Sequence, residues 1–168
     1  RFANALVTLG CTPAEMTWKA GVDVLSFGAT KNGALASEAV IFFDKKLAAE
    51  FEFRRKRGGH LFSKMRFLAC QMEAYLHNDL WIRNARHSNS MAFDLNKKLK
   101  KVENIKLLSP VEGNILFPEI PKHLRNKLSH DGFKFYDNRW GGDITRLVTS
   151  FNTKQLDINH FIASIENE

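Results

Sequence analysis

The first half of the chain contains two short apolar segments separated by a loop of small residues. Residues 22–27 and 39–43 are almost continuously apolar, which is typical of strands covered on both faces. The segment between them is rich in Gly, Ala, Ser and Thr, so we expect a loop that joins two interior strands. Upstream, residues 2–9 predict a short helix ended by a glycine, and a capping box over residues 12–15 predicts the start of a second short helix.

From residue 63 onward, apolar side chains recur at spacings of three and four. This period predicts two long amphipathic helices, the second reaching Leu99, with a bend near His77-Asn78. Beyond them, turns rich in Gly, Asp and Asn separate shorter elements. We predict strands at 105–108, 114–117, 133–136 and 144–151, and helices at 121–128 and 157–165. The order of elements favours an α/β enzyme with two lobes.

The positive charge of the chain leaves two interpretations open. The formal net charge is +7 over 168 residues, which favours an anionic partner, and the densest basic run is Arg54 to Arg57. That run fits the phosphate-binding patch of a noncatalytic nucleic-acid-binding module. It equally fits the last turn of a helix that begins near Lys45 and is stopped by Gly58-Gly59. Basic and aromatic residues do not alternate as in base-stacking surfaces, so the helix is favoured and no nucleic-acid partner is expected.

The apolar runs and the cysteines bear on location. The longest apolar runs are much shorter than the roughly 20 residues of a membrane helix, so we expect no membrane partner. Cys11 and Cys70 form no CxxC pair and lie in apolar surroundings, as expected of free, buried thiols in a reducing compartment. We therefore expect a soluble, cytoplasmic protein.

Lys31 is the principal candidate for chemistry, because it lies in the loop between the two predicted interior strands. A lysine kept poorly hydrated there has its charged form disfavoured, which leaves a nucleophilic amine able to form a Schiff base. The alternative is a lysine that extends into solvent from a surface loop. A P-loop is disfavoured because the GxxxxGK[ST] pattern is absent.

Arg146 is the second candidate. It alternates with apolar residues in a predicted strand, so its side chain faces away from that of Leu147. An arginine facing a cleft is a bidentate clamp for a carboxylate, whereas the alternative is an exposed strand face. The six histidines show no metal-ligand spacing, so no metal site is expected.

The segment DVLSFGATKNG, residues 23–33, resembles the cofactor-lysine segment of the threonine aldolase and β-eliminating lyase family. These are pyridoxal-phosphate enzymes of the aspartate-aminotransferase type. The resemblance continues through residues 39–44, the basic run, Ser63 to Phe67, Leu80-Trp81 with Asn84-Ala85, and Arg146 to Ser150, and so spans nearly the whole chain.

This resemblance implies a set of site residues. Lys31 would form the Schiff base with pyridoxal 5'-phosphate, with Thr30 beside it in the cofactor site. Arg146 and Arg1 would hold the α-carboxylate of a small amino-acid substrate. Arg66 would lie near the cofactor phosphate or near the site of a neighbouring subunit.

The resemblance also implies a fold and a reaction. Residues 1–77 would be the end of the large cofactor-binding domain and residues 78–168 a small C-terminal α/β domain. The chain begins where the family's HxDGAR motif ends, so we expect the C-terminal part of a longer homo-oligomeric enzyme, a dimer or tetramer, and little activity from this part alone. The expected reaction cleaves threonine or related β-hydroxy amino acids to glycine and an aldehyde. A related β-eliminating lyase is the alternative within the family.

Overall fold

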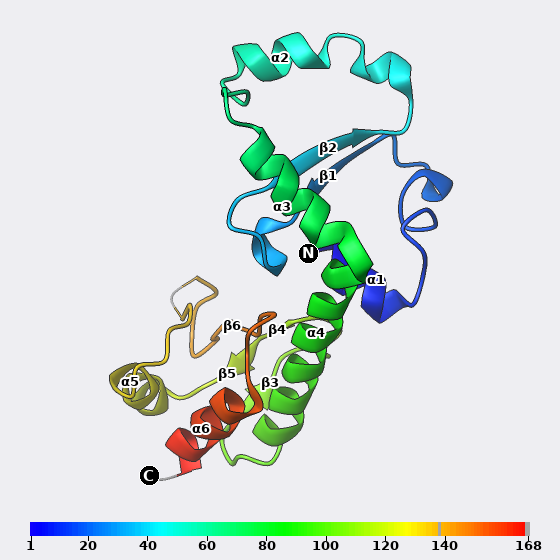
Figure 1. The fold of residues 1–168 in the computed structure, drawn as a ribbon. Coiled ribbons are helices and arrows are strands. Elements are labelled where there is room, and N and C mark those ends of the chain that lie inside the picture. Colours follow the sequence, from blue (N-terminus) through cyan, green and yellow to red (C-terminus); the bar gives the residue numbers. More distant parts are fainter. Residues whose placement is uncertain (138, 167–168) are drawn as a thin grey trace. The chain divides into compact units, whose positions relative to one another are not determined.

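The computed structural model describes residues 1–137 and 139–166, which fold into mixed helix and sheet as predicted. The chain divides into two compact units, unit 1 (Arg1–Asn84) and unit 2 (Ala85–Glu168). The boundary falls within α4 (Leu80–Leu99), the long helix of Figure 1. The assignment of residues 1–77 and 78–168 to two domains of a larger enzyme stays a prediction, and three residues of the second range lie outside the described part.

Unit 1 opens with α1 (Phe2–Leu9), which ends at Gly10 in a left-handed conformation, as predicted. The capping box also forms, because the carboxylate of Glu15 accepts hydrogen bonds from the amide and the hydroxyl of Thr12. It opens a run of turns and a 3₁₀ turn, Trp18–Ala20, in place of the expected helix. The hydroxyl of Thr17 donates to the carbonyl of Pro13, a local bond of the kind that competes with helix continuation.

The two apolar segments form β1 (Val24–Gly28) and β2 (Glu38–Phe42), paired antiparallel with Phe27 opposite Ala39. The prediction of strands is confirmed, but the prediction that both faces are covered is wrong for this chain. Among the described residues the two strands pair only with each other, so Val40 and Ile41 stay exposed.

The helical predictions for the rest of unit 1 hold with small changes. The helix that ends in the basic run consists of a 3₁₀ turn, Lys45–Ala48, followed by α2 (Phe51–Arg57), which Gly58 ends. α3 (Arg66–Leu76) leads into the predicted bend, where Asn78 and Asp79 both have positive φ. α4 then begins at Leu80.

The described residues of unit 2 form small antiparallel sheets and helical segments. β3 (Lys106–Leu107) pairs with β5 (Pro118–Glu119), and β4 (Ile115–Leu116) pairs with β6 (Leu147–Val148). α5 (Lys122–His130) and α6 (Gln155–Glu166) match the predicted helices. Both belong to unit 2, together with the part of α4 that begins at Ala85. The predicted strand at 133–136 is reduced to one bridge between Tyr136 and Arg146.

A contiguous hydrophobic core holds unit 2 together. Its buried members come from α4, β4, α5, β6, α6 and the segments between them: Ala92, Leu95, Leu99, Leu116, Ile120, Leu124, Leu128, Leu147, Ile158, Phe161, Ile162 and Ile165. Burial of apolar side chains at this density supplies most of the stability of a small domain.

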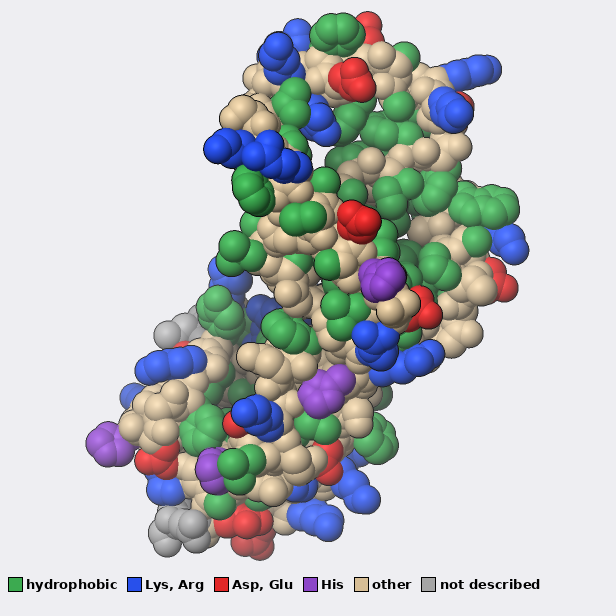
Figure 2. All heavy atoms as spheres, viewed as in Figure 1, with side chains coloured by type: hydrophobic (Ala, Val, Ile, Leu, Met, Phe, Trp, Pro, Cys, Tyr) green, Lys and Arg blue, Asp and Glu red, His purple; other side chains and the backbone are tan. Residues whose placement is uncertain are grey.

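Unit 1 has a smaller buried cluster of aromatic rings. Phe27 of β1 packs edge-on against Phe2 of α1 and Trp81 of α4, with ring centroids 5.9 and 5.6 Å apart, and Tyr75 of α3 adjoins it. Many other large apolar side chains of unit 1 stay exposed, and Figure 2 shows hydrophobic side chains at the surface around its sheet and helices. Within the described residues, no helix has both the length and the apolar character needed to cross a membrane.

Candidate active site

Lys31 lies on a 3₁₀ turn, Thr30–Asn32, directly after β1. The completely buried Ala29 precedes the turn, and its amide donates to the carbonyl of Ser37 at 2.9 Å. The hydroxyl of Thr30 accepts from the amide of Ser37 at 3.2 Å. Thr30 therefore closes the loop that carries Lys31.

Asn32 anchors the other side of this turn. Its side chain is only 5% exposed, and its Nδ2 donates to the hydroxyl of Tyr75 at 2.6 Å and to the carbonyl of Trp81 at 2.9 Å. The Nδ2 of Asn84 donates in turn to the carbonyl of Asn32 at 2.8 Å. Residues of α3 and α4 thus hold the backbone immediately after Lys31.

A second set of bonds fixes the end of the loop next to β2. The Oε1 of Gln71 accepts from the amides of Leu35 and Ala36 at 3.0 and 3.1 Å. The hydroxyl of Ser37 donates to the carbonyl of Leu68 at 3.1 Å. Both ends of the loop are therefore tied to α3, although the loop itself has no regular structure beyond the short turn.

The side chain of Lys31 is exposed to solvent, so the prediction of a poorly hydrated amine between interior strands is wrong for this chain. The strands that flank it form an open pair with exposed residues on both faces, whereas Ala29 and Asn32, on either side of Thr30 and Lys31, are buried. The structure thus combines an immobilised turn with an accessible amine.

Arg1, Lys31 and Glu38 lie close together in unit 1. The charges of Lys31 and Glu38 both act at the main-chain nitrogen of Arg1, with opposite signs. The carboxylate of Glu38 covers the backbone of Gly28, where an added Cβ would clash with it. Two of the predicted site residues, Arg1 and Lys31, are therefore brought together beside one carboxylate.

Arg66 is the first residue of α3 and is exposed. Its guanidinium lies over the ring of Phe67, 5.1 Å from the centroid. This contact with a neighbour in sequence neither joins Arg66 to the Lys31 turn nor occupies its hydrogen-bond donors.

Arg146 belongs to unit 2 and directly precedes β6. The predicted alternation is confirmed, because Leu147 points into the core while Arg146 is only half-buried. Its amide donates to the carbonyl of Tyr136 at 2.8 Å, and its guanidinium lies over the Tyr136 ring, 5.7 Å from the centroid. The backbone hydrogen bond restrains the main chain of Arg146, and the ring of Tyr136 contacts its guanidinium.

Reasoning from the sequence missed the structural role of the residues that hold the two ends of the loop that carries Lys31. Asn32, Gln71, Tyr75 and Asn84 carry the anchoring hydrogen bonds. The available signal was a polar residue, Asn84, on the apolar face of a predicted helix between Trp81 and Ala85.

The thiols also differ from expectation. Both cysteines are free, as predicted, but Cys70 is exposed and Cys11 is half-buried. Cys70 is a residue of α3, and its thiol donates a hydrogen bond to the carbonyl of Phe67.

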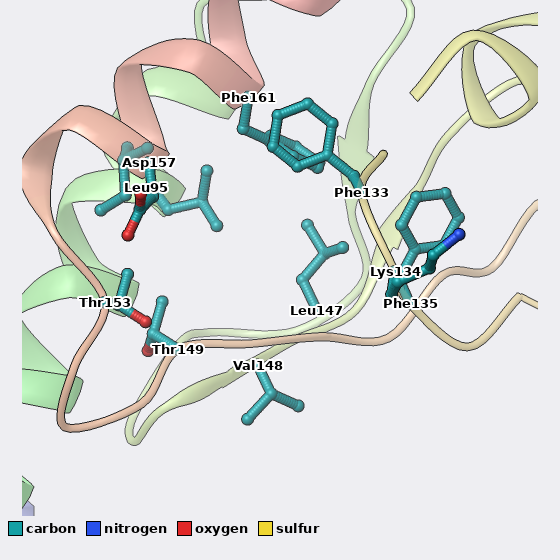
Figure 3. A pocket seen from close by; sticks show the side chains of 11 residues that line it. Leu95, Phe133, Lys134, Phe135, Leu147, Val148, Thr149, Thr153, Asp157 and Phe161 are labelled. Atoms are coloured by element: carbon teal, nitrogen blue, oxygen red, sulfur yellow. The ribbon is translucent and has the colours of Figure 1, made fainter. Parts of the chain in front are cut away.

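Two hollows in the described part of the chain bear on the site. One of about 320 Å³ lies in unit 1 beside the Lys31 turn and is lined by Ala34, Leu35, Tyr75 and Asn84 among others. The other, of about 180 Å³, lies in unit 2 among Leu95, Phe133, Leu147 and Phe161 (Figure 3). The described residues contain no group of three or more His, Cys, Asp or Glu side chains able to hold a metal ion.

Two polar side chains that line the hollow of unit 2 already have partners. The hydroxyl of Thr149 donates to the carbonyl of Ser88, and a carboxylate oxygen of Asp157 accepts from the amide of Lys154. This hollow is therefore a weaker candidate for polar chemistry than the Lys31 turn.

Comparison with known proteins agrees with the resemblance read from the Lys31 segment. The family model described as beta-eliminating lyase matches residues 1–121. A low specificity L-threonine aldolase from a Pseudomonas species is 41% identical over 165 residues, which is 98% of this chain and 47% of the relative. A second, from Pseudomonas aeruginosa, is 46% identical over 136 residues, covering 81% of this chain and 39% of the relative.

A solved structure gives the same picture. The threonine aldolase of Leishmania major superposes with a TM-score of 0.89 at 28% identity, covering 99% of this chain and 49% of that one. The chain thus spans about half the length of the first of the curated relatives that it matches. The match of the family model over most of the sequence, together with these relatives, places the chain in the beta-eliminating lyase family.

Proposed function

We propose that the chain is the C-terminal part of a pyridoxal-phosphate-dependent threonine aldolase, which cleaves threonine or related β-hydroxy amino acids to glycine and an aldehyde. The observation that carries this proposal is the turn of Lys31, where an accessible amine stands on an anchored backbone. The names of the relatives, which are low specificity L-threonine aldolases, support the choice of reaction.

The donor set of unit 1 suits pyridoxal 5'-phosphate. The aldehyde of the cofactor condenses with a primary amine, which Lys31 offers. The cofactor phosphate is an anion that cations bind, and the cation Arg1 lies near Lys31. We assign Thr30 to the cofactor site as well, because its hydroxyl uses an acceptor position toward Ser37 and keeps its own proton to donate. Arg66, exposed at the start of α3, is proposed to bind the cofactor phosphate or to serve a neighbouring subunit. When bound, the cofactor acts as an electron sink for the bond that breaks at the substrate Cα.

The substrate carboxylate is assigned to Arg146, with Arg1 as the second contact. A guanidinium binds a carboxylate through two parallel hydrogen bonds, which fixes orientation as well as position. The bond to the carbonyl of Tyr136 and the ring of the same residue limit the freedom of Arg146. A carboxylate held in this way determines which bond of the substrate is aligned for cleavage, so the arginines control the type of reaction.

The exposed surface of unit 1 fits a larger assembly. The relatives are about twice as long, and large apolar side chains of β1 and β2 are uncovered. We propose that further chain and a second copy of the protein cover this surface and enclose the amine of Lys31 in a homo-oligomer, a dimer or a tetramer. The free thiols of Cys11 and Cys70 support a cytoplasmic location.

A β-eliminating lyase is the second candidate, favoured by the description of the family model. It would use the same lysine and carboxylate contacts on substrates that carry a leaving group at the β-carbon. A comparison of threonine with a β-substituted amino acid such as cysteine separates the two reactions.

The test joins the chain behind the unmatched residues of the Pseudomonas relative and supplies pyridoxal phosphate. Borohydride reduction should fix the cofactor on Lys31, as detected by peptide mass spectrometry, and threonine should yield glycine. Lys31→Ala should lose both. Lys45→Ala, an exposed lysine on another 3₁₀ turn, is the matched control and should keep both. Full turnover by Lys31→Ala would refute the proposal.

A further inference from the structure

We propose that Asn32 is a positioning residue that aims the amine of Lys31 at the cofactor. The inference rests on the proposed function. It adds that the hydrogen bonds of the buried side-chain amide of Asn32 position Lys31. Asn32 is the next residue after Lys31, and its side chain and its carbonyl both have partners in helices that follow much later in the sequence.

The side chain of Asn32 uses both hydrogens of one amide nitrogen. One goes to the hydroxyl of Tyr75 and the other to the carbonyl of Trp81. An aspartate has the same shape but no hydrogens to donate, so it would turn a carboxylate toward the carbonyl of Trp81. The arrangement therefore requires an amide at this position.

The protonation state of Tyr75 is compatible with its hydroxyl accepting the hydrogen bond from Asn32. Burial raises the pKa of Tyr75 above its ordinary value, against the hydrogen bond from Asn32 and with help from the charge of Glu38. The phenol therefore stays neutral, and the residue as a whole is only 4% exposed. A buried neutral hydroxyl next to a buried amide forms a bond that water does not replace.

The loop has a second anchor that does not involve Asn32. Gln71 binds the amides of Leu35 and Ala36, and Ser37 binds the carbonyl of Leu68. Loss of the Asn32 bonds would therefore release the end next to Lys31, while the end next to β2 stays attached. This separation distinguishes positioning from a general role in folding.

The experiment uses the fused protein described above and measures how fast pyridoxal phosphate becomes attached to Lys31, trapped by borohydride and counted by peptide mass spectrometry. Asn32→Ala and Asn32→Asp should slow attachment roughly 10- to 100-fold, the size expected when a reacting group is displaced by about 1 Å. Gln71→Ala, which loosens the other end of the loop, is the matched control and should slow it less than about threefold. Hydrogen exchange should rise in residues 29–34 of the Asn32 variants and in residues 34–37 of the control.

The outcomes separate the two proposals. If the unaltered protein attaches the cofactor at Lys31 and the folded Asn32 variants attach it equally fast, the positioning role is wrong and the proposed function stands. If the unaltered protein attaches none, both are wrong. Should Asn32→Ala not fold, Asn84→Ala removes only the bond to the Asn32 carbonyl, and it must still slow attachment. In turnover, a positioning role predicts a lower kcat per folded molecule with KM for threonine little changed, where circular dichroism gives the folded fraction. General unfolding would lower only the folded fraction and leave kcat per folded molecule unchanged.

Discussion

In unit 2, helices α4, α5 and α6 enclose a contiguous hydrophobic core, whereas unit 1 buries a small group of rings and leaves much of β1 and β2 exposed. Unit 2 contains enough apolar contact to hold its fold by packing. In unit 1 the loop that carries Lys31 is held by side-chain hydrogen bonds to α3 and α4. The difference indicates that unit 2 is stabilised mainly by its own core, whereas unit 1 buries less apolar surface of its own.

The largest expected effect comes from the ring cluster of unit 1. Phe27→Ala should cost about 3–5 kcal/mol, because Phe27 is buried between α1, α3 and α4. Phe53→Ala, at a site that is 75% exposed, should change stability by about 0.5 kcal/mol or less. Hydrogen exchange of the β1 amides measures both. Equal effects would mean that the rings do not hold unit 1 together.

The core of unit 2 gives the next effect. Leu128→Ala should destabilise the unit by about 2–5 kcal/mol, since Leu128 of α5 is completely buried and leaves a cavity. Leu156→Ala, on the exposed side of α6, is the control and should be nearly neutral. Denaturant unfolding followed by circular dichroism checks the pair. A neutral Leu128→Ala would contradict the account of a self-supporting core.

Alkaline pH should weaken unit 1. The raised pKa of Tyr75 means that the folded state keeps the phenolic proton where the unfolded chain releases it. Stability is therefore unchanged below the ordinary value of 10.0 and falls as the pH rises through and beyond it. Denaturant midpoints measured between about pH 9 and 11 should show the decline, and Tyr75→Phe should flatten it. The same slope in both proteins would exclude Tyr75 as its source.

The smallest effect concerns the exposed capping box. Hydrogen bonds from the amide and then the hydroxyl of Thr12 lower the pKa of Glu15 below its ordinary value of 4.5. This local contribution is present above 4.5 and is lost as the pH falls through the lowered pKa. An NMR titration should find the Glu15 midpoint returning toward 4.5 in Thr12→Ala. Thr12→Ala keeps the backbone amide, so the return should be partial, and an unchanged midpoint would show that the hydroxyl does not lower the pKa of Glu15.

Local patterns predicted the helices well. The period of α3 and α4, the bend between them and the end of α1 at Gly10 all follow from short-range signals. The strands of unit 2 were harder, because two-residue strands such as β5 are too short to show an alternation, and Pro118 interrupts the segment in which β5 begins. Periodicity reports what a segment favours over a few turns, so longer elements were predicted more accurately.

The site was predictable only in part. Lys31 was identified from its loop, but its exposure was not predicted. Apolar strands indicate that their faces need a covering surface, and they do not indicate whether that surface is present. The anchors of Asn32 join residues 43 to 52 positions apart in sequence, which no local pattern encodes. Arg146 was assigned to the correct face because alternation along a strand is local.

The position of Glu38 over Gly28 has a use in protein engineering. Gly28 has an ordinary backbone conformation, so alanine can replace it without distorting the strand, and the added methyl group meets only the end of a flexible side chain. A single carbon atom at this position would therefore move a negative charge away from its present place near Arg1 and Lys31. Libraries that aim to retune this neighbourhood could begin there, with the main chain left as it is.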